Sequence, residues 1–203
     1  MTSIFISMFV FSLIGAISPG PVNIIAASTG ANFGFKAVFP HIIGATISYT
    51  LIVLVMGVGL NQILTIFPQF TAILKYLGAT FLVYMSYKIA TAASFEADDF
   101  IADNETKPPS FIEGMLSQGL NPKAWMVSMS GVGLFVLPNT PTYIYIMAFS
   151  VISFFFCFFG IGTWAAIGQL IGRFLSTKKR QISFNVFMGL LLASTVVSIL
   201  MSS

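Results

Sequence analysis

Residues 18–23 interrupt an apolar run that extends over residues 4–27, and the interruption contains the sequence Pro19-Gly20-Pro21. A proline has no amide donor and its ring clashes with the carbonyl four residues back, so no unbroken helix passes through this segment. In lipid, backbone groups freed by such a break persist only against other protein or beside water. The sequence therefore predicts a broken membrane helix that faces a wet cavity.

A second interruption, Asn121-Pro122-Lys123, lies in a later apolar run and adds a charge to the same pattern. Two broken helices in corresponding positions are typical of transporters, whose substrate sites lie between two structural repeats. The alternative is that both prolines only kink helices for packing. The lysine favours the functional interpretation, because charges within membrane spans are rare and costly.

Composition places the chain in the membrane. Of its 203 residues, 57% are hydrophobic and only 7% are charged, against about 25% charged in soluble domains. The apolar runs are each about 20 residues long, the length of a helix that crosses a hydrocarbon core of about 30 Å. The sequence predicts an all-α integral membrane protein, with the lipid bilayer as a partner.

Six transmembrane helices are expected, the first and the fourth broken by proline. They are placed at residues 3–29, 38–60, 70–90, 111–137, 143–172 and 182–201. Gly30 and Gly34 are interpreted as a turn after the first span rather than as a close helix contact. Residues 1–94 and 110–203 then form two three-helix repeats.

The polar stretch 95–109 is interpreted as an acidic cytoplasmic linker between these repeats, and its charges as solvated rather than cation-binding. Ser110 and Glu113 have the spacing of a helix capping box, which gives Glu113 a structural role.

The basic residues indicate the orientation. Those in the connectors after the first, third and fifth spans are Lys36, Lys88, Lys107, Arg173, Lys178, Lys179 and Arg180, whereas the opposite side has Lys75. The positive-inside rule makes these connectors cytoplasmic and both termini external. Three spans per repeat then make the two repeats inverted. The first residues, Met1-Thr2-Ser3, include no Lys or Arg that could form the basic region of a signal peptide. The first run is therefore expected to stay in the membrane as a span.

A site for a zwitterionic substrate is expected at the breaks, where helix-end amides suit a carboxylate and freed carbonyls suit an ammonium group. The carbonyls of Gly15, Ile17 and Gln118 are the expected acceptors. The candidate substrate-binding residues are Pro19, Gly20, Pro21, Asn23, Gln118, Asn121, Pro122, Lys123 and Trp164.

Three of the candidate residues have structural alternatives. Counting residues from Gly114 places Lys123 near the middle of the hydrocarbon core. There it either binds the substrate carboxylate, snorkels inward, or donates to the carbonyl freed by Pro122. Trp164 either lines the pocket or packs. His41 is the candidate for proton coupling, because its unperturbed titration lies in the neutral range, and the alternative is a bond to a neighbouring carbonyl.

Enzymatic and redox functions have little support. The single Cys157, set among phenylalanines, excludes an internal disulfide and is interpreted as a small buried hydrophobe. With one histidine, His41, far from it, no nucleophile–base pair or metal cluster is expected, and neither is a cofactor. A cation or metal-ion exporter of similar fold stays open as the alternative, and so does a homodimer. Scattered basic residues indicate no nucleic-acid surface.

Several motifs resemble those of lysine exporter (LysE/RhtB) family amino-acid efflux carriers. The first half contributes Pro19-Gly20-Pro21, Gly34, Gly44 and residues 75–82; the second contributes Phe111, Gly114, residues 119–124, Gly172-Arg173 and Gly189. The resemblance covers essentially the whole chain, and residues 19–24, 88–91 and 135–138 are most similar to the cysteine and O-acetylserine exporter branch.

The resemblance implies export of amino acids or close derivatives from a bacterial cytoplasm, through the inner membrane, by alternating access. One departure matters. Many relatives have an acid in the second span, where this chain has Ser48-Tyr49, and this puts carboxylate-based proton coupling in doubt.

Overall fold

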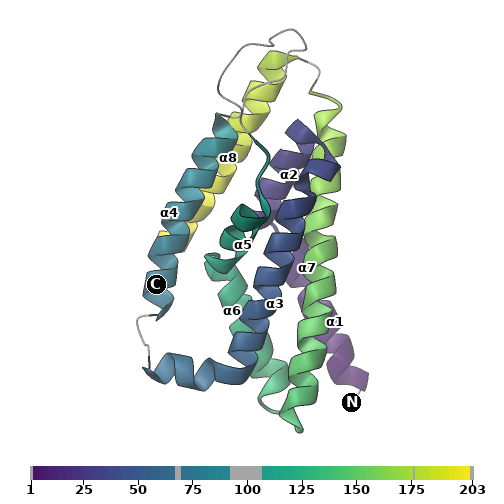
Figure 1. The fold of residues 1–203 in the computed structure, drawn as a ribbon, viewed down its shortest axis with the longest axis vertical. Coiled ribbons are helices and arrows are strands. Elements are labelled where there is room, and N and C mark those ends of the chain that lie inside the picture. Colours follow the sequence, from purple (N-terminus) through teal and green to yellow (C-terminus); the bar gives the residue numbers. More distant parts are fainter. Residues whose placement is uncertain (1, 67–69, 92–106, 176, 202–203) are drawn as a thin grey trace.

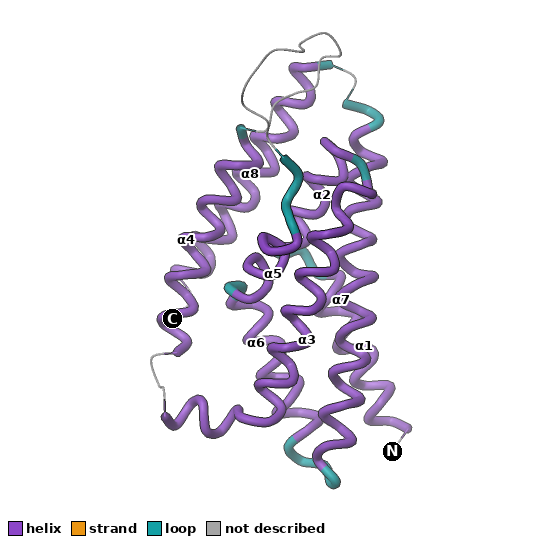
Figure 2. Tube along the Cα trace, in the orientation of Figure 1, coloured by secondary structure: helices purple, strands orange, loops and turns teal. Residues whose placement is uncertain are grey.

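The computed structural model describes residues 2–66, 70–91, 107–175 and 177–201, and the chain in these ranges forms helices joined by short loops (Figure 2). The helices are α1 (Thr2–Ile17), α2 (Pro21–Phe33), α3 (Phe35–Ile66), α4 (Phe70–Ala90), α5 (Phe111–Gly119), α6 (Pro122–Gly131), the π-helical turn η1 (Val132–Val136), α7 (Thr142–Gly172) and α8 (Lys178–Met201). The all-α prediction is confirmed for the described residues.

Both proline interruptions break their helices as expected. The first separates α1 from α2, and the two helices are bent by 56°. The second lies between Gly119, where α5 ends, and Pro122, where α6 begins. Each proline occupies the first position of the new helix, where a missing N–H has no cost.

The turn after the first broken helix differs from the prediction. Helix α2 continues through Gly30 to Phe33, and the turn consists of Gly34, which adopts φ 81° and donates its N–H to the Gly30 carbonyl at 3.0 Å. A side chain at this φ would be strained, so glycine suits the position. Gly30 instead takes the role of a close helix contact, because a Cβ there would overlap the carbonyl oxygen of Ala165.

The two halves of the chain are packed into each other (Figure 1). The broken helix of each half packs on the second helix of the other half: α2 and α1 contact α7, and α5 and α6 contact α3. The third helices, α4 and α8, pack side by side, as do α3 and α7. This reciprocal pattern is the one that two inverted three-helix repeats would produce.

Glycines allow the closest of these contacts. On α7, a Cβ at Gly168 or Gly172 would overlap the carbonyl oxygen of Ala27 or Ala31 on α2. Where α3 passes α5, a Cβ at Gly114 would overlap the carbonyl oxygen of His41. Small residues of this kind let helix backbones meet in membranes, where no hydrophobic force drives association.

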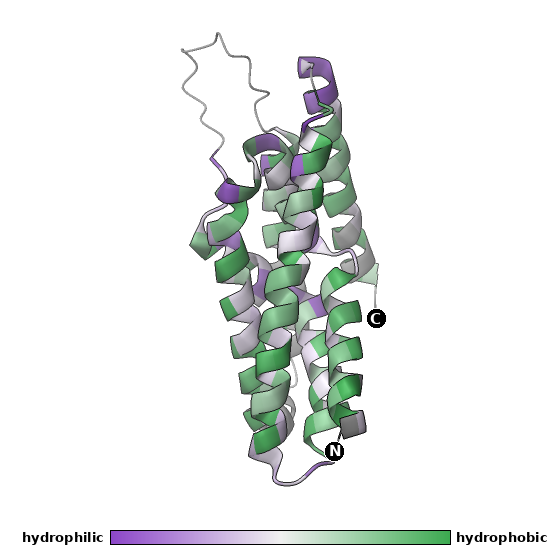
Figure 3. Cartoon of the chain, turned by 90° about the vertical axis from the view of Figure 1, so that its right-hand side faces the viewer, coloured by the Kyte–Doolittle hydropathy of each residue, from purple (hydrophilic) through white to green (hydrophobic). Residues whose placement is uncertain are grey.

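The helices seen in Figure 3 are mostly apolar, drawn in green, and hydrophilic residues appear near the upper end and about halfway along the bundle. Within the part of the chain that the structure describes, two helices are long and apolar enough to cross a membrane singly, α3 over Phe35–Gly59 and α7 over Thr142–Gly172. The bent pair α1 and α2 would be a third crossing if it forms one span. The six crossings stay a prediction.

Helix α7 ends and α8 begins at the upper end of Figure 1, and both chain ends lie in its lower half. The predicted capping box is confirmed: Ser110 Oγ accepts from Glu113 N at 3.2 Å, and the Glu113 carboxylate accepts from Ser110 N at 2.8 Å. Glu113 also forms an ion pair with Lys88 on α4.

The acidic linker predicted at 95–109 lies, up to residue 106, outside the described residues.

Candidate functional site

The C-terminal end of α1 is capped by side chains from three other helices, α2, α7 and α6. Asn23 on α2 donates to the carbonyls of Ala16 and Ser18, at 2.8 and 3.0 Å. Trp164 on α7 donates its indole N–H to the Ile17 carbonyl at 3.0 Å. Carbonyls at a helix end have no partner in the helix itself, so these donors replace the bonds that the break removes.

Lys123, in the first turn of α6, joins the two breaks. Its Nζ donates to Ser18 Oγ at 2.7 Å, to the Ser18 carbonyl at 3.1 Å and to the Pro19 carbonyl at 3.3 Å. Gly20 makes room for it, because a Cβ at Gly20 would lie 3.2 Å from Nζ. The ammonium group of one half therefore lies on the carbonyl end of a helix in the other half, where a positive charge is favoured.

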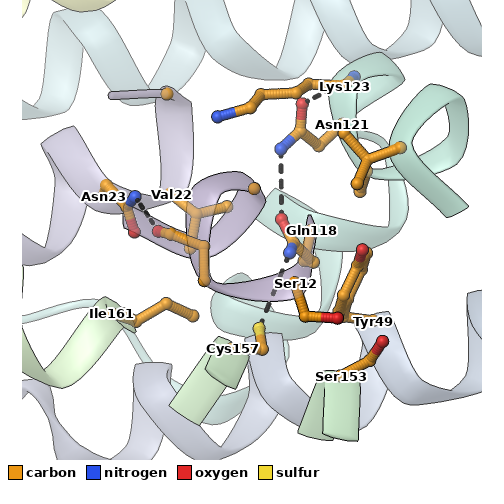
Figure 4. A pocket seen from close by; sticks show the side chains of 15 residues that line it. Ser12, Val22, Asn23, Tyr49, Gln118, Asn121, Lys123, Ser153, Cys157 and Ile161 are labelled. Atoms are coloured by element: carbon orange, nitrogen blue, oxygen red, sulfur yellow. Dashed lines mark hydrogen bonds between the residues drawn. The ribbon is translucent and has the colours of Figure 1, made fainter. Parts of the chain in front are cut away.

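A line of polar side chains leads from the second break into the bundle (Figure 4). Asn121 caps α6 by accepting the N–H of Lys123 at 3.1 Å, and its amide nitrogen donates to Gln118 Oε1 at 3.1 Å. Gln118 Nε2 in turn points to Cys157 Sγ at 3.8 Å. Each side chain orients the next, so the positions of Asn121 and Gln118 depend on each other.

These residues line a pocket of about 50 Å³, space for a few water molecules. Its polar lining side chains are those of Ser12, Asn23, Tyr49, Gln118, Asn121, Lys123, Ser153 and Cys157. Figure 4 shows Lys123 and Asn121 at one end, Ser12, Tyr49 and Ser153 at the other, and Gln118 between them. The pocket extends from the meeting point of the breaks into the bundle.

The pocket is electropositive. Among the described residues that line it, Lys123 is the one with a formal charge, and none is Asp or Glu. The other lining residues carry no formal charge, and Val22, Val127 and Ile161 among them are apolar. A group that enters next to Lys123 meets a positive charge in surroundings of low dielectric constant, where the charge acts strongly.

The structure brings five of the sequence-predicted site residues together in the pocket lining: Gly20, Asn23, Gln118, Asn121 and Lys123. Pro19, Pro21 and Pro122 form the breaks without lining the pocket, and Trp164 lies beside it as the cap of Ile17.

His41 lies apart from the pocket, fully buried on α3 against the backbone of Val22. Neither of its ring nitrogens makes a hydrogen bond of standard geometry within the described residues.

The acceptors expected to be free are occupied. The Gly15 carbonyl accepts from Ser18 Oγ at 3.0 Å, the Ile17 carbonyl from Trp164, and the Gln118 carbonyl from Asn121 N at 3.1 Å. Lys123 does not use the carbonyl freed by Pro122 but those of Ser18 and Pro19. The backbone carbonyls at the first break therefore already accept hydrogen bonds from protein side chains.

Sequence reasoning missed four of the polar lining residues, Ser12, Tyr49, Ser153 and Cys157. Cys157 was interpreted as a buried hydrophobe, and it is buried, but its sulfur faces Gln118. The serines carry no sequence signal, because small hydroxyl residues are common in membrane helices for packing alone. Only the assembled bundle shows that helices α1, α3 and α7 direct them to one place.

Comparison with known families decides the class of the protein. The profile of the LysE type translocator family matches residues 13–203. The chain belongs to the LysE type translocator family. This LysE-type protein is accordingly a transporter and not an enzyme.

Its curated relatives match along their whole length. Proteins named cysteine/O-acetylserine efflux protein from Escherichia coli O157:H7, Escherichia coli O1:K1 and Shigella flexneri serotype 5b are 32%, 31% and 31% identical to it over 201 residues. In each case the alignment covers 98% of this chain and 99% of the relative. No solved structure matches this LysE-type chain.

Proposed function

We propose that this protein exports amino acids or close derivatives from a bacterial cytoplasm, through the inner membrane, and that cysteine and O-acetylserine are among its substrates. The observation that carries the proposal is the position of Lys123, whose ammonium group lies where two broken helices meet. It lies at the edge of a pocket in which none of the described lining residues is acidic. The names of the relatives supply the substrate candidates.

The carboxylate of the substrate would bind Lys123. The present acceptors of its Nζ are two carbonyls and a hydroxyl, all neutral. A carboxylate makes a stronger, charge-assisted hydrogen bond with an ammonium group than these neutral oxygens do. Helix α2, which starts at Pro21 without a side-chain cap, adds first-turn amides to the same place.

The ammonium group of the substrate would take over carbonyls that Lys123 releases, together with the amide oxygens near them. Gln118 Oε1 and Asn121 Oδ1 each accept one protein donor and have a second lone pair. The site would thus hold both charges of a zwitterion with one lysine and neutral oxygens. The break residues Pro19, Gly20, Pro21 and Pro122 shape it, and Asn23 and Trp164 hold the end of α1.

Transport would proceed by alternating access between two inverted repeats, residues 1–94 and 110–203, with residues 95–109 as their cytoplasmic linker. The reciprocal packing of each broken helix on the opposite half supports this arrangement. A substrate at the breaks would lie between the repeats, where movement of the surrounding helices would open the site first to one side and then to the other.

The proposed orientation, with six crossings and both termini outside, can be tested by labelling. Single cysteines replacing Thr140 and Lys178, both exposed, are introduced in a Cys157→Ser background. A membrane-impermeant maleimide should label the first in intact cells, because it lies on the side opposite the basic connectors. The second should react only after permeabilisation. Labelling of the Lys178 position in intact cells would reverse the orientation.

The function is tested by uptake into inverted membrane vesicles, in which export from the cytoplasm becomes accumulation. Vesicles containing the protein should accumulate labelled cysteine, serine or O-acetylserine above the level of vesicles without it. A panel of divalent metal ions in the same vesicles tests the rival, a cation or metal-ion exporter. Metal accumulation without amino-acid accumulation would replace the proposal by that rival.

A further inference from the structure

Two buried hydroxyl groups at the inner end of the pocket have no use in the site described so far. Ser12 on α1 is 7% exposed and Ser153 on α7 is 1% exposed, and both line the pocket. Neither Oγ has a hydrogen-bond partner within the described residues. Buried polar groups are nearly always bonded, so an unbonded pair that faces one cavity requires an explanation.

The neighbours of these hydroxyls give the inner end a distinct chemistry. Tyr49 from α3 and Cys157 from α7 line it with them, and Figure 4 shows Ser12, Tyr49 and Ser153 grouped away from Lys123. We call these four residues the hydroxyl end. It contains no ionisable group of the carboxylate, ammonium or guanidinium kind, whereas the single lysine of the pocket lies at the other end.

We propose that the hydroxyl end binds the side chain of the transported amino acid and selects a short, uncharged side chain that can form hydrogen bonds. This inference rests on the proposed function, which places the carboxylate of the substrate on Lys123. With the carboxylate there, the side chain extends past Gln118 toward Ser12 and Ser153.

The chemistry of the hydroxyl end sets the substrate class. A serine hydroxyl donates one hydrogen bond and accepts two, so it serves a thiol, a hydroxyl or the carbonyl of a short ester equally. A lysine-like or glutamate-like side chain would be buried there without a counter-charge, which is costly. A short aliphatic side chain would fit but would leave both hydroxyls unbonded.

The test removes the two hydroxyls and leaves the rest of the pocket unchanged. In inverted vesicles, serine and 2-aminobutyrate, which has a methyl group in place of the hydroxyl, compete against a labelled substrate. The parent protein should prefer serine. In the Ser12→Ala/Ser153→Ala variant the preference should fall by about tenfold, the size of a good net hydrogen bond.

The matched control is Ser150→Ala. Ser150 also lies on α7, is 4% exposed and has an Oγ without a partner within the described chain, but it does not line the pocket. Its replacement should leave the preference for serine as it is in the parent. A further variant, Ser153→Thr, keeps a hydroxyl and adds a methyl group, so it should lower transport of the longer O-acetylserine more than transport of serine.

Each outcome has a definite meaning. If the parent does not distinguish serine from 2-aminobutyrate, or if the double variant keeps the parent's preference, the hydroxyl end does not select the side chain, although amino-acid export stands. Transport of O-acetylserine by Ser153→Thr at the parent's rate overturns the inference in the same way. If the parent accumulates no amino acid at all, the proposed function fails first and the inference fails with it.

Discussion

Lys123→Gln should weaken amino-acid binding by about tenfold to a hundredfold, the range expected when a hydrogen bond to a charged group is lost. Glutamine keeps a donor near Ser18 and Pro19 but has no charge with which to bind a carboxylate. The protein should still fold and insert, because the present acceptors of Lys123 Nζ are neutral oxygens that an amide can also serve. Substrate-dependent thermal stabilisation of the purified variant measures the affinity.

The contacts of Lys123 also permit a purely structural interpretation, in which it is a permanent bond between the two halves. Ser18→Ala separates the two, because it removes the shortest contact, at 2.7 Å, and keeps the charge. If Lys123 binds the carboxylate, Ser18→Ala should bind substrate far better than Lys123→Gln does. If both variants lose stability without substrate and folded Lys123→Gln binds as tightly as the parent, the lysine is only a structural bond.

His41→Gln should abolish accumulation driven by a pH gradient and leave exchange of labelled for unlabelled substrate intact. We propose His41 as the proton-coupling residue because it is fully buried and its ring nitrogens make no standard hydrogen bond within the described residues. A protonated imidazole in this position would be costly unless water or an acid reached it. Proton uptake would therefore favour a conformation in which water or an acid reaches the imidazole.

The residues around His41 would connect the charge of its imidazole with the packing of two helices. The charged groups near it are Glu113, which acts on it from α5, and Lys88, which is paired with Glu113. The closest backbone approach is at Gly114, where a Cβ would overlap the His41 carbonyl oxygen. A change of charge on the imidazole thus acts on the packing of α3 against α5. Unchanged gradient-driven accumulation in His41→Gln, at equal protein levels, would rule out this role.

Local features of this chain were predictable from sequence, and long-range ones were not. Proline breaks a helix through its own missing donor, so the ends at Ile17 and Gly119 followed from Pro19, Pro21 and Pro122. The capping box of Ser110 and Glu113 spans three residues and was equally accessible. The partner of Lys123 lies 105 residues away in the chain, and nothing near residue 123 indicates it.

The pocket lining shows the same limit of sequence-based prediction, because some of its residues were predicted and others were not. Asn23, Gln118 and Asn121 were predicted because they lie at or next to the proline breaks. Ser12 and Ser153 were not, because a serine costs little in a helix and is usually a packing residue. What makes these two informative is the lack of a bond combined with exposure to one cavity, and both properties belong to the assembled bundle.

The glycine contacts described above determine which helices can separate. Where one backbone lies directly on another, as at Gly168 on Ala27 or Gly114 on His41, no side chain is present that could change its rotamer and let the helices slide by a small step. Any movement that preserves these contacts carries α2 together with α7, and α3 together with α5. The rigid bodies of such a movement would then each combine helices from both halves of the sequence, and their boundary would differ from the boundary between the repeats.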